Sequence, residues 1–465
     1  MVIPLTVEEY VRRSILLGPK RLEKYVFRDD KPNPERRIIG EILDELEKFS
    51  ETKENRILLL YGLRGVGKTT LMAQTYFKLL GKVSQERLLY ISADEVALLN
   101  SDMLEAVKTY EALIGERFEE LSRPVFLFID EVHYDKNWDL ILKSLYDKAR
   151  NLFVLATGSS ALAIKMSTDL ARRARRLHVT PLTFSEYLAI KRNVKNGISS
   201  ELRNALFSSD SMEACKKLEA LRNEVGKILL QFDKMDLDDY IVQGTLPVFL
   251  SSKEPLYDTY TLIERMIYKD LALYGFSSEI LEKAFSLLVL LASGESLNYE
   301  TLCSNLNISR PTLAQLLSGL EKLEIVFPVR AYGSIGKNVR KTPKYKFLAP
   351  MLRASILTKF NLFTLDEKIL GMLLEDAVAL YFYILSSELN FRVNYDAQKG
   401  GADFVLTFPD KKIVIEVGYG NKGIKQVKRT MRKVDANFGI VIWEGNLEVE
   451  GDIIKVPKEW FMLII

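Results

Sequence analysis

Cysteine and histidine are scarce in this chain of 465 residues, which contains only two of each. Cys215 and Cys303 lie far apart and form no metal-ligand spacing, so a buried thiol is the expected role of each. With only His133 and His178 present, a histidine-based zinc site is not expected either. The chemistry of this protein must therefore rest on other side chains.

Long apolar runs and a strong net charge are also missing. No apolar run approaches the length needed to cross a bilayer, and the N-terminus lacks the pattern of a signal peptide, so we expect a cytoplasmic protein with no membrane association. The net charge is +3, so any nucleic-acid binding must depend on local basic patches. The length predicts roughly two to four domains.

One segment, residues 62–69, carries the pattern G-x-x-x-x-G-K-[ST] of a phosphate-binding loop. An apolar stretch at 57–61 precedes it and a helix-like stretch at 70–74 follows, which is the required strand–loop–helix context. Lys68 is expected to reach the β- and γ-phosphates, and the Thr69 hydroxyl to bind Mg²⁺. The pattern predicts ATP as cofactor, bound by Gly62, Leu63, Arg64, Gly65, Val66, Gly67, Lys68, Thr69 and Thr70.

A second signature lies at 124–131, where a continuous apolar run ends in two carboxylates. Such a run is typical of a strand buried on both faces of a parallel sheet, whose carboxyl end is where ligands bind. We expect Asp130 to hold Mg²⁺, and Glu131 to act as the catalytic base that orients and deprotonates water. The alternative is an acidic N-cap for a helix near 138–146.

A third predicted strand, 152–156, ends in polar residues. Thr157 or Ser159 could lie beside the γ-phosphate and sense it, although Ser159 or Ser160 could equally cap a helix beginning near residue 161. The apolar stretch 88–92 predicts a further strand between the two signatures. This order of elements is that of the additional-strand class of P-loop ATPases.

Four arginines follow at 172, 173, 175 and 176. One of them could contact the γ-phosphate as an arginine finger, in cis or from a neighbouring subunit of a homo-oligomer. Arg172 and Arg173 are the preferred candidates because they come first after the sensor region. The alternative is a solvated basic face of a helix.

Several segments together resemble archaeal and bacterial AAA-type ATPases that carry a C-terminal domain with a restriction-endonuclease-like fold. The segments are 62–71, 128–133, 155–160, 175–188, 239–250 and 401–406. The resemblance implies an α/β fold in which a P-loop ATPase core with a parallel sheet is followed by further domains. We expect a helical N-terminal segment, the core, a helical lid, a winged helix and the restriction-endonuclease-like domain at 1–50, 51–190, 191–275, 276–360 and 361–465. Residues 240–249 are expected to return the chain to the core, and structural packing is the favoured role of this stretch.

The winged-helix prediction rests on residues 297–348. Ser309 is placed to cap a second helix, with a leucine stripe at helical spacing behind it. Arg310, Thr312 and Gln315 would then face DNA, with Lys337 and Arg340 in a basic wing on phosphate. A winged helix that binds protein or is purely structural is the alternative.

The last hundred residues resemble a metal-dependent nuclease in which carboxylates hold Mg²⁺ and a lysine assists water. Glu375, Asp403 and Glu416 match the acidic positions, but Gly418 stands where the lysine is expected. Lys425 might substitute, yet a domain that has lost cleavage and retained DNA binding is the favoured interpretation.

The helix that follows carries five basic residues beside an apolar stripe. Phosphate contact and a solvated amphipathic face are equally good interpretations of this pattern. The basic residues are Lys425, Lys428, Arg429, Arg432 and Lys433.

These sequence patterns are consistent with three functions. The first is Mg²⁺-dependent ATP hydrolysis coupled to binding or remodelling of DNA. The second is a nucleotide-controlled signalling switch that binds protein partners. The third is an ATP-dependent nuclease.

Overall fold

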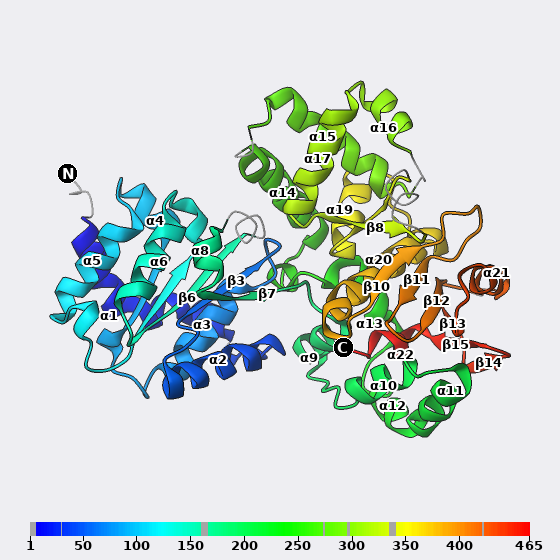
Figure 1. The fold of residues 1–465 in the computed structure, drawn as a ribbon, viewed down its shortest axis with the longest axis horizontal. Coiled ribbons are helices and arrows are strands. Elements are labelled where there is room, and N and C mark those ends of the chain that lie inside the picture. Colours follow the sequence, from blue (N-terminus) through cyan, green and yellow to red (C-terminus); the bar gives the residue numbers. More distant parts are fainter. Residues whose placement is uncertain are drawn as a thin grey trace. The chain divides into compact units, whose positions relative to one another are not determined.

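The computed structural model describes residues 6–28, 30–159, 166–272, 275–294, 298–333, 341–420 and 423–465. The chain forms two compact units, Met1–Thr180 and Pro181–Ile465, here called the first and the second unit (Figure 1). The predicted α/β class is confirmed. The finer division into five domains stays a prediction.

A five-stranded parallel sheet forms the centre of the first unit. Its strand order is β4-β5-β6-β3-β7, with every neighbouring pair parallel. The apolar runs that predict strands are buried because helices cover both faces of the sheet (Figure 1). The strands are β3 (Ile57–Gly62), β4 (Leu88–Ser92), β5 (Val125–Asp130), β6 (Leu152–Ser159) and β7 (Ala174–His178).

The helices of the first unit connect these strands and close its core. The longest, α1 (Val7–Val26), begins at a capping box between Thr6 and Glu9 and packs on α3, α5 and β4. The others are α2 (Ile38–Thr52), α3 (Lys68–Leu79), α4 (Ala93–Leu98), α5 (Met103–Ile114), α6 (Trp138–Lys148) and α8 (Thr168–Ala171).

An eight-stranded mixed sheet organises the second unit, in the order β14-β15-β13-β12-β11-β10-β8-β9. The strands are β8 (Val326–Ala331), β9 (Lys344–Phe347), β10 (Arg392–Tyr395), β11 (Phe404–Thr407), β12 (Lys412–Val417), β13 (Phe438–Trp443), β14 (Glu448–Glu450) and β15 (Ile453–Pro457). The antiparallel pair β8–β9 joins the other strands through the parallel pairing of β8 with β10. The sheet is therefore continuous across the boundary predicted at 360.

Two helices cover opposite faces of this sheet. Phe404 packs against Phe382 of α20 (Glu367–Glu388), with ring centroids 5.2 Å apart. The next residue, Val405, belongs to the cluster of buried residues under α21 (Lys425–Val434). Since successive residues of a strand point to opposite faces, α20 and α21 lie on opposite sides of β11.

Helix α20 corrects the expectation that no segment could cross a bilayer. By length and composition it could do so, with an 18-residue window of mean hydropathy 1.6. However, 67% of this window is buried inside the protein, where α20 packs against β9, β10 and β12. This environment is that of a core helix, and it accounts for the apolar character.

The remaining helices of the second unit flank the sheet (Figure 1). Those before the predicted winged helix are α9 (Phe184–Arg192), α10 (Ser199–Leu206), α11 (Ser211–Ala220), α12 (Arg222–Leu229), α13 (Lys234–Asp239) and α14 (Pro255–Arg265). They are followed by α15 (Ser278–Ala292), α16 (Tyr299–Leu306), α17 (Arg310–Lys322), α19 (Pro350–Lys359) and, at the end, α22 (Lys458–Met462).

Residues 240–249, expected to return the chain to the core predicted at 51–190, contact the last part of that range. The Tyr240 hydroxyl donates to the Leu182 carbonyl oxygen at 2.7 Å, and the Leu182 N–H donates to the Thr245 carbonyl oxygen at 2.9 Å. Tyr240–Gly244 form a π-helical turn that packs on α19 and α20 of the second unit. Helix α11, in the predicted lid, contacts β15 of the same unit. Both segments find their apolar partners in the second unit, which local sequence patterns do not specify.

Candidate active site

The loop between β3 and α3 is built around three glycines whose backbone conformation favours glycine. Gly62 has φ 151°, and a Cβ there would lie 2.2 Å from the carbonyl oxygen of Val179. Gly65 and Gly67 have φ 87° and 90°, in the left-handed region that favours glycine. Gly67 is the N-cap of α3, so the loop presents backbone N–H groups at a helix N-terminus, an arrangement suited to phosphate.

Lys68 lies in the first turn of α3 and is folded back over this loop. Its Nζ donates to the carbonyl oxygens of Gly62 at 2.9 Å and Leu63 at 3.1 Å, and the residue is 7% exposed. The ammonium group is thus held at the centre of the loop by backbone acceptors. A phosphate group there would offer it stronger, charged acceptors.

Asp130, at the carboxyl end of β5, is the hub of the site. Its Oδ2 accepts from the Thr69 hydroxyl at 2.9 Å, and its Oδ1 accepts from the Thr157 hydroxyl. The Tyr90 hydroxyl lies 3.4 Å from Oδ2. Burial and the neighbouring Glu131 charge raise the pKa of Asp130, while hydrogen bonds from Thr157 and Thr69 act in the opposite direction.

Glu131 leaves the strand in a left-handed conformation, with φ 52°. Its N–H donates to the Thr157 hydroxyl at 3.0 Å, and its Oε2 lies 3.2 Å from Nδ1 of His133. Helix α6 begins only at Trp138 and its N-cap is Asn137. The alternative interpretation of the carboxylates as an N-cap of this helix is therefore wrong.

Of the two proposed sensor residues, Thr157 is the one the fold brings to Asp130. It is fully buried in β6 and contacts both residues of the acidic pair. Ser159 is the last residue of β6 and lies opposite Gly62 in the register. The predicted helix start near residue 161 falls on 160–165, outside the described residues.

The basic run after the sensor region does not form one helix face. Arg175 and Arg176 lie on β7, the edge strand beside β3, so the helical alternative is wrong for them. Arg173 is held by Asp147, at 2.8 Å from Nε, and by the Asp169 carbonyl oxygen at 2.8 Å. Arg172 is the C-cap of α8 and is exposed. Arg172 is thus more available than Arg173.

The sequence motifs missed an arginine that supports the phosphate loop. Arg36 is buried, and its guanidinium donates to the carbonyl oxygens of Val66 at 2.8 Å and Thr180 at 3.0 Å. It therefore ties the loop to the end of the first unit. No pattern surrounds Arg36, so nothing in the sequence indicated this contact.

A second missed group connects α1 to the acidic strand. The Arg21 guanidinium lies 5.3 Å from the centre of the Tyr90 ring and pairs with Glu95. Tyr10 of α1 donates to Glu95 at 2.8 Å and accepts from the Ser92 N–H. The Tyr90 hydroxyl in turn lies 3.4 Å from Asp130, so α1 supports the site through Tyr90.

In the second unit, the three predicted nuclease carboxylates lie at α20, the start of β11 and β12. Glu375 pairs with Lys346 of β9, and the Asp403 carboxylate accepts from the Val417 N–H at 2.9 Å. Burial and the charges of Glu375 and Glu416 raise the pKa of Asp403 to about 7. For Glu375, burial is outweighed by the Lys346 and Lys344 charges, which lower its pKa.

These residues do not fit a metal site. Among the described residues, no group of three or more His, Cys, Asp or Glu side chains is placed to hold a metal ion. At the position expected for the nuclease lysine, the Gly418 N–H donates to the Ile442 carbonyl oxygen, as ordinary sheet backbone. Lys425 lies in the first turn of α21 and is exposed.

The elements predicted for the winged helix occur in the expected order: α16, a turn, α17 and the β8–β9 pair. The Ser309 hydroxyl caps α17 by accepting from the Thr312 N–H at 3.3 Å. Arg310 and Gln315 are exposed on this helix, and Thr312 is half-buried. Lys337 and Arg340 lie outside the described residues.

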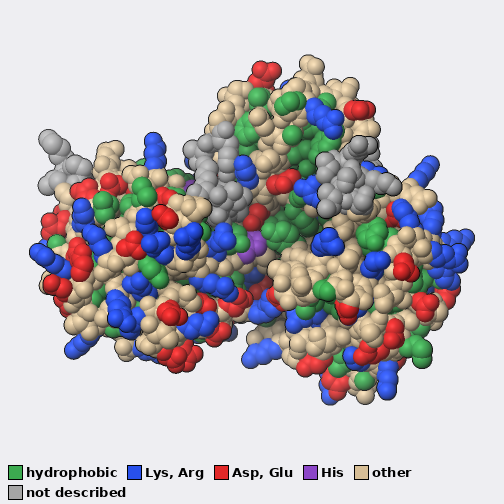
Figure 2. Space-filling view, viewed as in Figure 1, with side chains coloured by type: hydrophobic (Ala, Val, Ile, Leu, Met, Phe, Trp, Pro, Cys, Tyr) green, Lys and Arg blue, Asp and Glu red, His purple; other side chains and the backbone are tan. Residues whose placement is uncertain are grey.

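Several basic residues of α21 are engaged within the protein. Lys428 pairs with Glu450 at 3.2 Å, Arg429 donates to the Lys399 carbonyl oxygen at 2.9 Å, and Lys433 pairs with Asp396. Blue side chains still gather at the right-hand edge of Figure 2, where Figure 1 places α21. The face is basic, but much of its charge is locally balanced.

Two family models match the chain. One, described as an AAA domain, matches residues 54–188, and one described as a domain of unknown function (DUF8612) matches residues 234–362. The chain is similar to the uncharacterized protein MJ1637 of Methanocaldococcus jannaschii, with 38% identity over 470 residues, covering 100% of this chain and 95% of that protein. Similarity to MJ1544 of the same organism is 28% over 171 residues, covering 34% and 37% of the two chains.

Among solved structures, the chain is similar to Aeropyrum pernix ORC1 in complex with DNA and to a Thermotoga maritima RuvB variant. The TM-scores are 0.33 and 0.30, with 14% and 17% identity. The matches cover 72% and 64% of this chain, and 95% and 90% of the others.

Proposed function

Because this chain belongs to the family of MJ1637 from Methanocaldococcus jannaschii and contains an AAA domain, we propose that its first unit hydrolyses ATP with Mg²⁺. The observation that carries this proposal is the position of Asp130. Two hydroxyls, one from the phosphate loop and one from the sensor strand, converge on its carboxylate, and Glu131 follows directly. A phosphate loop, an oxygen-ligand pair and a base thus meet at one edge of a parallel sheet.

Mg²⁺ fits the donor set at this edge. The Thr69 hydroxyl and the Asp130 carboxylate are hard oxygen ligands 2.9 Å apart, the type that Mg²⁺ prefers beside phosphates. These two residues would hold the ion, which would neutralise charge on the β- and γ-phosphates.

The other residues bind the nucleotide and position water. Lys68 exchanges its carbonyl acceptors for phosphate oxygens, while the loop N–H groups bind the remaining phosphate oxygens. Glu131 orients the attacking water and accepts its proton. Thr157 fixes Asp130 and the Glu131 backbone in their relative positions, and so links the base to the metal ligand.

An arginine supplied by a neighbouring copy would complete the site, and Arg172 is the residue proposed for it. We expect Arg172→Ala to lower turnover by at least about tenfold without changing the melting temperature, since an arginine finger stabilises only the transition state. Arg173→Ala is the matched control. It should lower the melting temperature instead, because it removes the contacts to Asp147 and Asp169. Equal turnover in Arg172→Ala and the wild type would eliminate Arg172 from this role.

Coupling to DNA is the second part of the proposed function. It is supported by the exposed Arg310 and Gln315 of α17, which follow a turn in the order expected of a helix-turn-helix. The balanced charges of α21 make this helix the weaker candidate. The alternative, a switch that binds protein partners, uses the same nucleotide site and predicts indifference to DNA.

A DNA-binding titration distinguishes coupling to DNA from a switch that binds protein partners. Binding to duplex, single-stranded and branched DNA is measured over a range of salt concentrations, with and without a nonhydrolysable ATP analogue. We expect affinity that falls with salt and that weakens by about tenfold or more in Arg310→Ala, the size of one lost base contact. Arg222→Ala, which removes an exposed arginine of α12, should bind as the wild type does. No binding to any DNA at moderate salt would favour the protein-partner switch.

A further inference from the structure

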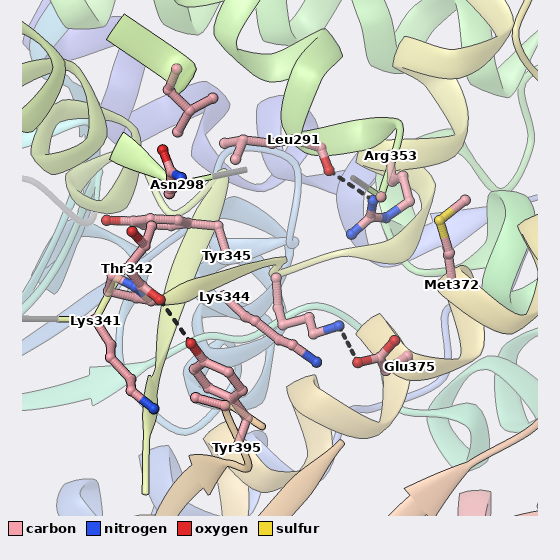
Figure 3. A pocket seen from close by; sticks show the side chains of 15 residues that line it. Leu291, Asn298, Lys341, Thr342, Lys344, Tyr345, Arg353, Met372, Glu375 and Tyr395 are labelled. Carbon is pink, nitrogen blue, oxygen red and sulfur yellow. Dashed lines mark hydrogen bonds and ion pairs between the residues drawn. The ribbon is translucent and has the colours of Figure 1, made fainter. Parts of the chain in front are cut away.

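A pocket of about 420 Å³ in the second unit opens beside Glu375, one of the three predicted nuclease carboxylates (Figure 3). Its wall includes β9 and the residues before it, so lysines 341, 344 and 346 all line it. Arg353 also lines the pocket, but its guanidinium is paired with Asp376 and bonded to two carbonyl oxygens of α15. Lys346 and Lys344 act on Glu375 more strongly than Arg353 does.

The carboxylates behind this pocket form a compact negative cluster. Asp403 precedes β11, and Glu416 lies on the neighbouring strand β12, where Phe404 is registered with Ile415. Glu416 is 1% exposed. Asp403 lies close enough to both Glu375 and Glu416 for their charges to act on it. Buried charges of one sign are costly unless positive charge is supplied nearby.

Lys344 and Lys346 supply that charge. Being two residues apart on β9, they project from the same face of the strand. Lys346 is 7% exposed, forms the ion pair with Glu375, and has its Nζ 5.9 Å from the ring of Phe404, the residue next to Asp403. Lys344 reaches towards Glu375 in Figure 3, and its charge acts on both Glu375 and Asp403.

We propose that Lys344 and Lys346 take the place of a divalent metal ion at the Glu375–Asp403–Glu416 cluster. The two ammonium groups deliver about the same total charge as one divalent ion, from a strand that precedes the C-terminal segment in the chain. The cluster is thereby a metal-independent part of the core. This proposal does not depend on ATP hydrolysis in the first unit, and it explains why the missing lysine at Gly418 has no replacement from α21.

A Mn²⁺ titration tests this proposal. Binding of Mn²⁺ to the full-length protein without nucleotide is followed by the electron paramagnetic resonance signal of free Mn²⁺. In the wild type the carboxylate cluster should bind no Mn²⁺, so Asp403→Asn should leave the Mn²⁺ binding of the protein unchanged. Lys346→Met and Lys344→Met should each gain a Mn²⁺ site, at least about tenfold tighter than any Mn²⁺ binding detected in the wild type, because a repelling charge near the ion has been removed. Lys341→Met, which removes a pocket lysine with no described contact to these carboxylates, and Lys346→Arg, which keeps the charge, should behave as the wild type.

Two results would overturn the proposal. One is a wild-type Mn²⁺ site that Asp403→Asn abolishes, which would mean that the cluster holds metal beside its lysines. The other is a folded Lys346→Met or Lys344→Met protein with no new Mn²⁺ site. If Lys346→Met does not fold, the wild-type titration and Lys344→Met still decide, and cleavage of DNA by the wild type with Mn²⁺ would likewise count against the proposal.

Discussion

We expect replacement of Glu131 with glutamine to lower the rate of ATP hydrolysis by at least about 100-fold, the effect of losing a general base. Glutamine keeps the size and shape of the side chain but cannot accept the proton of the attacking water. The contacts of Asp130 with Thr69 and Thr157 do not involve the Glu131 side chain, so nucleotide affinity should change little. Phosphate release and nucleotide titration, measured on the same preparation, separate the two effects.

Two variants of β6 test the role of Thr157 in the same assay. Thr157→Val removes the hydroxyl that bonds both Asp130 and the Glu131 backbone, and we expect a fall of about 10- to 100-fold, the value of one hydrogen bond to a charged group. Ser159→Ala, two residues on, is the matched control and should retain its activity. Full activity in Glu131→Gln would show that Glu131 is not the base.

Replacing Lys68 with alanine has the second largest expected effect, loss of nucleotide binding. The variant removes the ammonium group that lies at the centre of the phosphate loop, where Gly62 and Leu63 hold it. Two charge-assisted contacts to phosphate are worth about 3–6 kcal/mol together, so the affinity for ATP should fall at least about 100-fold. Titration with ATP by isothermal calorimetry measures this change.

Lys78→Ala provides the control for Lys68→Ala. Lys78 lies in the last turn of the same helix and pairs with Glu35, away from the loop, so its loss should leave the affinity for ATP unchanged. Circular dichroism of both variants checks that α3 remains folded. Unchanged affinity in Lys68→Ala would place the nucleotide elsewhere.

The geometry of the proposed nucleotide site was predictable because its signals are local. Loop glycines, Lys68 and Thr69 fall within eight residues, and Asp130 and Glu131 end an apolar run that can only be a buried strand. A parallel sheet then brings such strand ends to one edge. The place of Asp130 and the parallel sheet itself needed no long-range information beyond this rule, whereas the choice between Thr157 and Ser159 needed the fold.

The contacts that the sequence did not predict join residues far apart in the chain. These contacts form only because sheets and helices pack in three dimensions. Examples are the pairs Lys346–Glu375, Arg36–Val66 and Lys433–Asp396. The same packing makes residues 174–178 an edge strand although their charge pattern fits a solvated helix. Sequence periodicity reports which face of an element is apolar, but not which distant partner covers it.

Phosphate release from Mg·ATP by the wild type, with Lys68→Ala and Glu131→Gln prepared in the same way, tests most directly whether the first unit is an ATPase. We expect turnover by the wild type, none by Lys68→Ala, and at most about a hundredth of the wild-type rate in Glu131→Gln. Of the two variants, only Glu131→Gln should still bind the nucleotide. Turnover that persists in both variants, or a wild type that neither binds nor hydrolyses ATP, would contradict the proposal that the first unit is an ATPase.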